Sequence, residues 1–153
     1  MKKKLFPYAL LILVSVFLAG CASKGEGPVK TEAVNLSKIR KQVESSVQDE
    51  AVQARLLGLT TTLEQQVQQL NDFDANGLSR VALMSADYGT TDTALLKANQ
   101  SFRIRRKPLQ SRIADTLFAM KAAAPPSVWP TLGRVAFDDT INNMVIKKIQ
   151  PES

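Results

Sequence analysis

The chain of 153 residues contains no histidine and a single cysteine, Cys21. Histidine is the most frequent general base in enzymes, histidine and cysteine are the usual zinc ligands, and cysteine supplies the thiol nucleophile. A chain with no histidine and no second cysteine is short of residues for acid–base, zinc and thiol chemistry. We therefore expect no catalytic residues, no metal site and no cofactor, and we expect that the protein is not an enzyme.

Patterns typical of β-strands are also missing. No run of alternating apolar and polar residues is bounded by turn residues at regular spacing. Apolar residues recur every three or four positions instead, which is the spacing of one face of a helix. The sequence therefore predicts an all-α protein.

The N-terminus has the three parts of a secretory signal. Lysines at positions 2–4 precede an almost unbroken apolar stretch of about 14 residues, and two small residues follow it before Cys21. The stretch is shorter than the roughly 20 residues that span a bilayer as a helix. We predict that residues 1–20 are a signal peptide of the lipoprotein type that is cleaved; an ordinary signal and an uncleaved anchor are the alternatives.

The run Leu18-Ala19-Gly20-Cys21 resembles the lipobox of bacterial lipoproteins. The resemblance implies that the Cys21 thiol is joined to diacylglycerol, that the chain is cut before Cys21, and that the new amino terminus is acylated with a chain such as palmitate. Two or more acyl chains give stable membrane attachment, whereas one chain holds only marginally. Since Ala22 rather than aspartate follows, the resemblance implies transport to the cell outer membrane. The domain is then expected in the periplasm, or facing outward as the alternative.

Size and charge limit the partners of the mature chain. Removal of 20 of the 153 residues leaves enough chain for one domain. The formal charge of +6 falls to +3 when the three lysines of the signal peptide are removed. This small basic excess, in a protein expected outside the cytoplasm, argues against a nucleic-acid partner. The expected partners are the membrane, through the N-terminal lipid, and a protein.

The mature chain divides into a tether at residues 21–34, a helical domain at 35–146 and a tail at 147–153. The tether contains glycine, proline and mixed charge without apolar periodicity, so we expect it to be flexible. Asn35 is the predicted cap of the first helix of the domain. Weak helix propensity at Ser45-Ser46, followed by acidic residues, leaves open whether the chain bends there or continues straight.

The domain is expected to reverse direction at residues 74–77 (Asp-Ala-Asn-Gly), which are turn residues. In the returning segment, Pro108 predicts a kink or a break near Arg106-Lys107. Pro125-Pro126 end this segment, and Ser127 is the predicted cap of a last helix. A seven-residue repeat predicts that the returning segment packs in coiled-coil fashion. Its members are Val81, Tyr88, Leu95, Phe102 and Leu109.

The predicted fold is a long antiparallel helical hairpin with broken helices and a short C-terminal helix packed over one end. Residues 31–74 carry seven acids and four bases, and residues 97–121 carry seven bases and one acid. These opposite charges favour pairing of the two arms, mainly as a choice of register. Residues 115–132 are similar to uncharacterised helical-hairpin lipoproteins of proteobacteria, a resemblance that implies no activity.

Three features are candidate binding sites. A basic cluster would bind anionic lipid head groups, lipopolysaccharide phosphates or an acidic partner, although the solvated face of a helix is the favoured interpretation. Trp129 would anchor a partner or, as we favour, close the end of the bundle. Asp138-Asp139 offer oxygen ligands without the spacing of a calcium loop, so a solvated face or a cap is favoured. The residues of the basic cluster are Arg103, Arg105, Arg106, Lys107 and Arg112.

Two functions remain open from the sequence. The first is a non-enzymatic, lipid-anchored interaction or scaffold module of the cell envelope, which predicts no cavity and an exposed apolar or basic patch larger than roughly a few hundred square ångströms. The alternative is a periplasmic lipid- or small-molecule-binding domain, which predicts a cavity lined by residues such as Leu63, Phe102 and Phe118.

Overall fold

The computed structural model describes residues 31–144, so that Cys21, the predicted signal peptide 1–20 and the predicted tail 147–153 lie outside the described residues. Between residues 31 and 144 the chain forms four helices and no strand, which confirms the all-α fold. The helices are α2 (Ser37–Ser46), α3 (Glu50–Ala86), α4 (Asp92–Ala123) and α5 (Trp129–Asn143).

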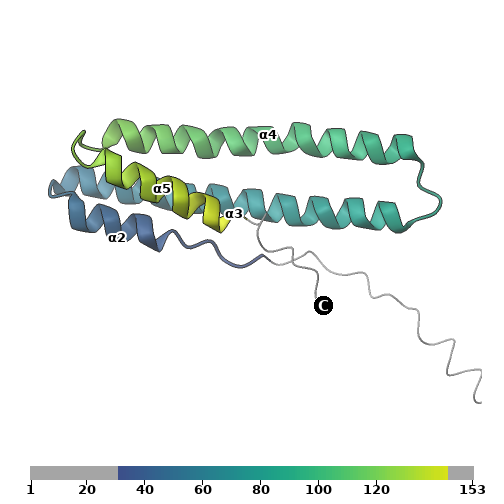
Figure 1. The fold of residues 1–153 in the computed structure, drawn as a ribbon, viewed down its shortest axis with the longest axis horizontal. Helices are drawn as coiled ribbons and strands as arrows, with labels where there is room; N and C mark the ends of the chain where they lie inside the picture. The colour runs from purple at the N-terminus through teal and green to yellow at the C-terminus, as the bar shows by residue number, and fades with distance from the viewer. Residues whose placement is uncertain (1–30, 145–153) are drawn as a thin grey trace, which may run out of the picture.

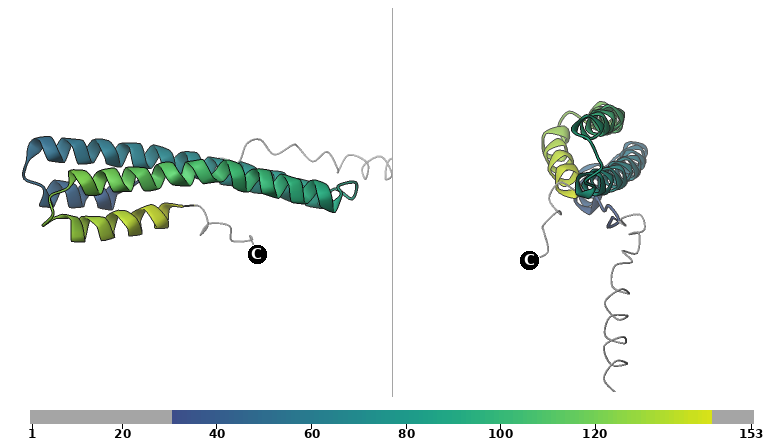
Figure 2. Two further views of the ribbon diagram at one scale, coloured as in Figure 1. Left: turned by 90° about the horizontal axis from the view of Figure 1, so that it is seen from above. Right: turned by 90° about the vertical axis from the view of Figure 1, so that its right-hand side faces the viewer.

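The two long helices, α3 and α4, form an antiparallel hairpin and lie side by side along their length (Figure 1). Helices α2 and α5 lie against only one half of this hairpin, and the view from above shows the same arrangement (Figure 2). We call the covered part the proximal half. Residues 71–112, which comprise the end of α3, the turn and the first part of α4, form the distal half.

The hydrophobic core lies entirely in the proximal half. Every buried apolar side chain between residues 31 and 144 falls within 36–70 or 113–136, and none falls within the distal half. The buried apolar residues are Leu36, Ile39, Val43, Val47, Leu56, Leu63, Val67, Leu70, Ile113, Met120, Ala124, Leu132 and Ala136. Four helices therefore share one core, while the distal half is a pair of helices without a third layer.

The boundary between α2 and α3 is a true break, which settles the alternatives left open at Ser45-Ser46. Asp49 is the N-cap of α3, and its side chain accepts hydrogen bonds from the backbone N–H groups of Ala51 and Val52 at 2.9 and 3.0 Å. Such a cap satisfies two of the N–H groups that a helix start leaves without partners. The chain therefore folds back, and α2 packs against α3 and α5.

The start of α2 is held by α3 and not by the predicted Asn35 cap, so that prediction is wrong. The N-cap is Leu36, whose backbone N–H donates to Glu64 Oε1 at 3.0 Å. Val34, in the last part of the expected tether, donates its N–H to Gln68 Oε1 at 2.8 Å. Side chains of α3 thus fix the entry of the chain into the domain, while the N–H of Ile39 in the first turn of α2 donates to Asp139 of α5.

The predicted reversal at residues 74–77 is also wrong, because α3 continues through this stretch to Ala86. The turn lies between Asp87 and Thr91, where Asp87 Oδ1 accepts the N–H of Gly89 at 2.9 Å and Thr91 caps α4. Tyr88, expected in the coiled-coil seam, is fully exposed in this turn. The hairpin is therefore longer than the sequence indicated.

Of the kink or break predicted near Pro108, the break is not found, because α4 runs without interruption from Asp92 to Ala123. Proline removes the hydrogen bond that its nitrogen would donate to the carbonyl group four residues earlier, here that of Ile104. Both Pro108 and Ile104 are exposed, so water can reach this carbonyl group. The cost of the proline is thereby reduced, and the helix continues.

Candidate functional site

The predicted basic cluster does not form one surface, because Arg106 is withdrawn into an ion pair. Its guanidinium group donates to both carboxylate oxygens of Asp74, with Nε–Oδ1 and Nη2–Oδ2 distances of 2.8 Å. The hydrogen bond from Arg106 to Asp74 raises the pKa of Arg106, against an opposing effect of burial. This bidentate pair joins α3 to α4 just beyond the hydrophobic core, and it leaves Arg106 committed to a structural role.

Arg105 belongs instead to an aromatic cluster between the two arms. Its guanidinium carbon lies 5.7 Å from the ring centroid of Phe73, a cation–π geometry. Phe73 stacks on Phe102 with 5.1 Å between ring centroids. Gly77 makes this approach possible, since a Cβ atom at that position would lie 2.1 Å from the Phe102 ring.

These aromatic rings line a groove between α3 and α4 with a volume of about 660 Å³, which we call the distal groove. The uncharged polar or small residues that line it are Asn76, Gly77 and Ser101. The apolar lining is shared by both helices, and its members are Phe73, Val81, Met84, Ala94, Ala98 and Phe102. A groove of this kind presents apolar side chains along the hairpin instead of enclosing a cavity.

Three cations complete the lining: Arg80 from α3 and Lys97 and Arg105 from α4. No acidic residue lines the groove. Among the described residues, the ion pairs are Arg40–Glu64 and Arg106–Asp74, so neither Arg80 nor Lys97 has a carboxylate partner there. The distal groove is therefore apolar inside and positively charged.

Two strongly exposed apolar side chains flank the groove. Leu83 and Ile104 are each 73% exposed. Leu83 follows Arg80 by three positions and Ile104 follows Lys97 by seven, spacings that place residues on the same helix face. Each of the two helices that form the groove thus also carries a strongly exposed apolar side chain near its lining.

The other members of the predicted cluster do not line the groove. Arg103, Lys107 and Arg112 are exposed. Arg112 lies seven positions after Arg105 and shares its helix face, whereas Arg103 and Lys107 lie on other faces of α4. Of the five predicted basic residues, the structure therefore brings only Arg105 into the groove.

Trp129 packs against the hydrophobic core and is half-buried at the first position of α5. The ring lies over Gly133, where an added Cβ atom would come within 2.8 Å of it. No side chain caps α5, so the prediction that Ser127 caps it is wrong, and Pro130 stands in its first turn. Trp129 therefore packs as part of the bundle.

The two acidic residues of α5, Asp138 and Asp139, lie in different environments. Asp138 is exposed, while Asp139 is buried and accepts a long hydrogen bond, 3.4 Å, from the N–H of Ile39 in the first turn of α2. A carboxylate at this position favourably meets the positive end of the α2 dipole. Between residues 31 and 144, no group of three or more acidic, histidine or cysteine side chains is placed to hold a metal ion.

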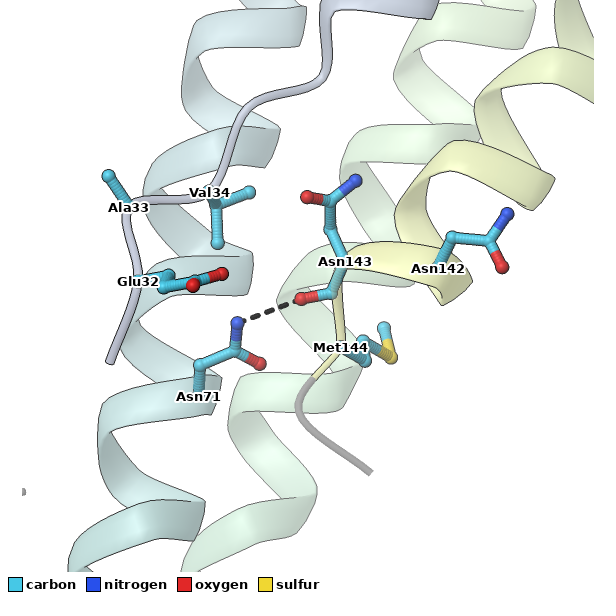
Figure 3. Close-up of a pocket in the computed structure, with 7 residues that line it drawn as sticks. All are labelled: Glu32, Ala33, Val34, Asn71, Asn142, Asn143 and Met144. Atoms are coloured by element: carbon cyan, nitrogen blue, oxygen red, sulfur yellow. Dashed lines mark hydrogen bonds between the residues drawn. The ribbon is translucent and has the colours of Figure 1, made fainter. Parts of the chain in front are cut away.

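A second, much smaller pocket lies where the chain enters and leaves the bundle (Figure 3). It has a volume of about 70 Å³ and is lined by residues 32–34, by Asn71 and by the end of α5. Asn71 Nδ2 donates to the carbonyl oxygen of Asn143 at 2.9 Å, which satisfies one of the last carbonyl groups of α5. Ligand sites usually measure roughly 300 Å³ or more. This pocket is much smaller, and we interpret it as the contact between the entering chain, α3 and the end of α5.

The alternative function, a small-molecule-binding domain, predicted a cavity lined by Leu63, Phe102 and Phe118. These three residues do not line a common cavity. Leu63 is fully buried, Phe118 is 69% exposed, and neither lines the groove that contains Phe102. The distal half instead has an open groove with apolar and basic lining, and Leu83 and Ile104 are strongly exposed on the same two helices.

Sequence reasoning missed Phe73, Arg80 and Lys97 as members of the site, because it placed the chain reversal at 74–77. With the reversal there, Arg80 and Lys97 belong to the same arm. Once the turn is placed at Asp87 to Thr91, the two residues fall at similar heights on opposite arms. The weak helix formers at Gly89 to Thr93 were the available signal.

No family of proteins, no curated protein and no solved structure gives a significant match to this chain. Within residues 31–144, no helix combines the length and the hydropathy that crossing a bilayer would require.

Proposed function

We propose that this protein is a lipid-anchored, non-enzymatic interaction module of the cell envelope, in which the distal half of the hairpin binds another protein. The observation that carries the proposal is the unequal distribution of the core. Four helices bury the apolar residues of the proximal half, whereas the distal half leaves an apolar and basic groove exposed. Contiguous exposed apolar surface of this kind typically marks an interaction site.

The different roles that we propose for the two halves follow from how each half is stabilised. The proximal half has a shared core, and the Arg40–Glu64 pair, with 2.5 Å between Nη2 and Oε2, fastens α2 to α3. The distal half depends on the Arg106–Asp74 pair and on aromatic packing across two helices. Such a pair of helices gains stability when a further element covers its apolar side, and binding a partner supplies that element.

The membrane attachment rests on the resemblance of residues 18–21 to a lipobox. Replacing Cys21 with alanine is expected to abolish metabolic labelling with palmitate and to leave a full-length precursor. Undiminished labelling of the Cys21→Ala variant would refute the lipid anchor while leaving the interaction module untouched.

The interaction is tested by removing exposed apolar surface from one half at a time. The double variant Leu83→Ser/Ile104→Ser is expected to lose proteins that co-purify with the tagged full chain after crosslinking in cells. The matched control Phe118→Ser/Phe137→Ser removes side chains that are 69% and 58% exposed in the proximal half, and it is expected to retain them. Loss in the control instead of the distal variant would place the interface on the proximal half and contradict the proposal.

A further inference from the structure

We infer that the distal groove binds an amphipathic helix of another protein whose apolar face is bordered by aspartate or glutamate. This inference rests on the proposed function and specifies the chemistry of the partner. Its three supports are the shape of the groove, the sign of its charges and their spacing.

The shape of the groove suits a helix. On α3 it extends from Phe73 to Met84, eleven residue steps, or about 16 Å of helix axis at 1.5 Å per residue. It is bounded by two antiparallel helices that also carry the exposed Leu83 and Ile104. A helix of about three turns can lie along it with residues spaced by three and four facing the apolar lining.

The sign of the charges selects an acidic partner. Arg80, Lys97 and Arg105 line the groove without any acidic residue. A second copy of this chain that docked through the same groove would bring its own three cations against them, and such like-charge contacts are unfavourable. The two segments of this chain outside 31–144 are also net positive by sequence: residues 1–30 hold five lysines and one glutamate, and residues 145–153 hold two lysines and one glutamate.

The spacing of the cations favours a peptide over a lipid. Lys97 and Arg105 are eight residues apart on α4, which separates their backbones by about 12 Å, and Arg80 lies on the opposite helix. One anionic head group is too small to meet all three cations. A helix with several carboxylates along its borders offers a partner to each of them.

The test uses the full chain, purified in detergent, and two fluorescent synthetic peptides. Both are helical 18-residue peptides, roughly five turns, with the same leucine and alanine face. One carries glutamate along the borders of that face and the other carries lysine. We expect the glutamate peptide to bind measurably more tightly by fluorescence anisotropy, with an affinity that falls as salt is added. Equal affinity for the two peptides would overturn the inference.

Charge reversal then assigns the binding to the groove. The variant Arg80→Glu/Lys97→Glu/Arg105→Glu is expected to bind the glutamate peptide at least about tenfold more weakly and to prefer the lysine peptide. Unfolding alone is expected to weaken the binding of both peptides, and circular dichroism of the variant checks that it is folded. The control Arg103→Glu/Lys107→Glu/Arg134→Glu makes the same change in net charge outside the groove, and it should leave the preference for glutamate intact. The inference fails if the control reverses the preference as the groove variant does.

Other occupants give different results. Displacement of the glutamate peptide by dihexanoyl phosphatidylglycerol, but not by dihexanoyl phosphatidylcholine, would assign the groove to anionic lipid and overturn the inference. Crosslinking of the purified chain to itself through a photoreactive residue at Ala98 would assign the groove to a second copy. The Leu83→Ser/Ile104→Ser variant can lose its co-purifying proteins while the unmodified chain binds both peptides equally. That result would support the interaction module and contradict an acidic helix as its partner.

Discussion

Gly77 shows how one missing side chain shapes the candidate site. Its Cα lies against the ring of Phe102, where a methyl group would come within 2.1 Å of a ring carbon. Glycine in a helix usually weakens it relative to alanine by roughly 0.5–1 kcal/mol, so its presence at this point has a packing reason. The close approach lets Phe102 stack on Phe73 and line the distal groove.

This contact predicts opposite outcomes for two glycines of the same helix. Gly77→Ala must displace Phe102 and is expected to lower the free energy of unfolding by about 1–3 kcal/mol. Gly58→Ala has no other atom within 4 Å of the new methyl group, and it should raise the free energy of unfolding by about 0.5–1 kcal/mol. Urea denaturation followed by circular dichroism measures both. Stabilisation by both substitutions would show that Phe102 does not pack on Gly77.

Glu64 gives the protein a predictable response to acid. Burial alone raises the pKa of Glu64, but hydrogen bonds from Arg40 and from the N–H of Leu36, with the charge of Arg40, outweigh it and lower the pKa below the ordinary 4.5. The unfolded chain therefore binds this proton more readily than the folded chain. The stabilisation is complete above pH 4.5 and is lost as the pH falls through the folded-state pKa.

The corresponding variant is Glu64→Gln, which removes the titrating group. The difference in unfolding free energy between the natural chain and this variant should shrink as the pH falls below 4.5. Urea denaturation at a series of pH values measures this difference. A difference that stays constant down to the acid limit would mean that Glu64 is not held in its charged form.

At the scale of helices, the hairpin depends on contacts that local sequence does not reveal. The recurrence of apolar residues every three or four positions correctly predicted that the protein is all-α. The stretch from Asp74 to Gly77 then resembled a turn, because each residue type favours turns in isolation. In the structure Asp74 pairs with Arg106, Asn76 bonds to the carbonyl oxygen of Asp72, and Gly77 admits Phe102.

The position of the turn decided how much of the site could be predicted. Arg105 was identified as a candidate binding residue from its basic neighbours, but a charge cluster in sequence does not tell which members face one another. Arg106 has an acidic partner 32 positions away, and Arg80 lies across the groove on α3. Both facts follow from the register of α3 against α4, which no local pattern of residues fixes.

Pro108 supplies a prediction for the continuity of α4. If the helix runs through this position, Pro108→Ala restores a backbone hydrogen bond to an exposed carbonyl group and removes a steric clash. Thermal unfolding is expected at higher temperature, with a gain of up to about 3 kcal/mol. Pro130→Ala is the control, since proline is well accommodated in the first turn of α5 and little should change. An unchanged or lower stability of Pro108→Ala would contradict an uninterrupted α4.

For the whole molecule, the asymmetric core predicts asymmetric stability. Helix α3 is one element of 37 residues, but only its first part packs into the four-helix core. In the purified chain, amide hydrogens of residues 56–70 should exchange with deuterium more slowly than those of residues 75–86, because the distal half opens at lower free energy. Hydrogen exchange read by mass spectrometry compares the two segments directly. Equal protection along α3 would contradict a distal half that lacks its own core.

The two halves thus have different roles in one continuous hairpin. The proximal half fixes the fold through buried apolar side chains, and the distal half presents the groove and its three cations. The proposed binding of a protein there would cover this exposed apolar lining.

Site-specific photocrosslinking in intact cells tests this claim most directly. A photoreactive residue is placed in the full chain at Leu83 or Ile104 in the distal half, and at Phe118 or Phe137 in the proximal half, all strongly exposed positions. The account predicts adducts with another protein at the two distal positions and not at the two proximal ones. Adducts at the proximal positions alone, or none at any position in folded protein, would contradict it.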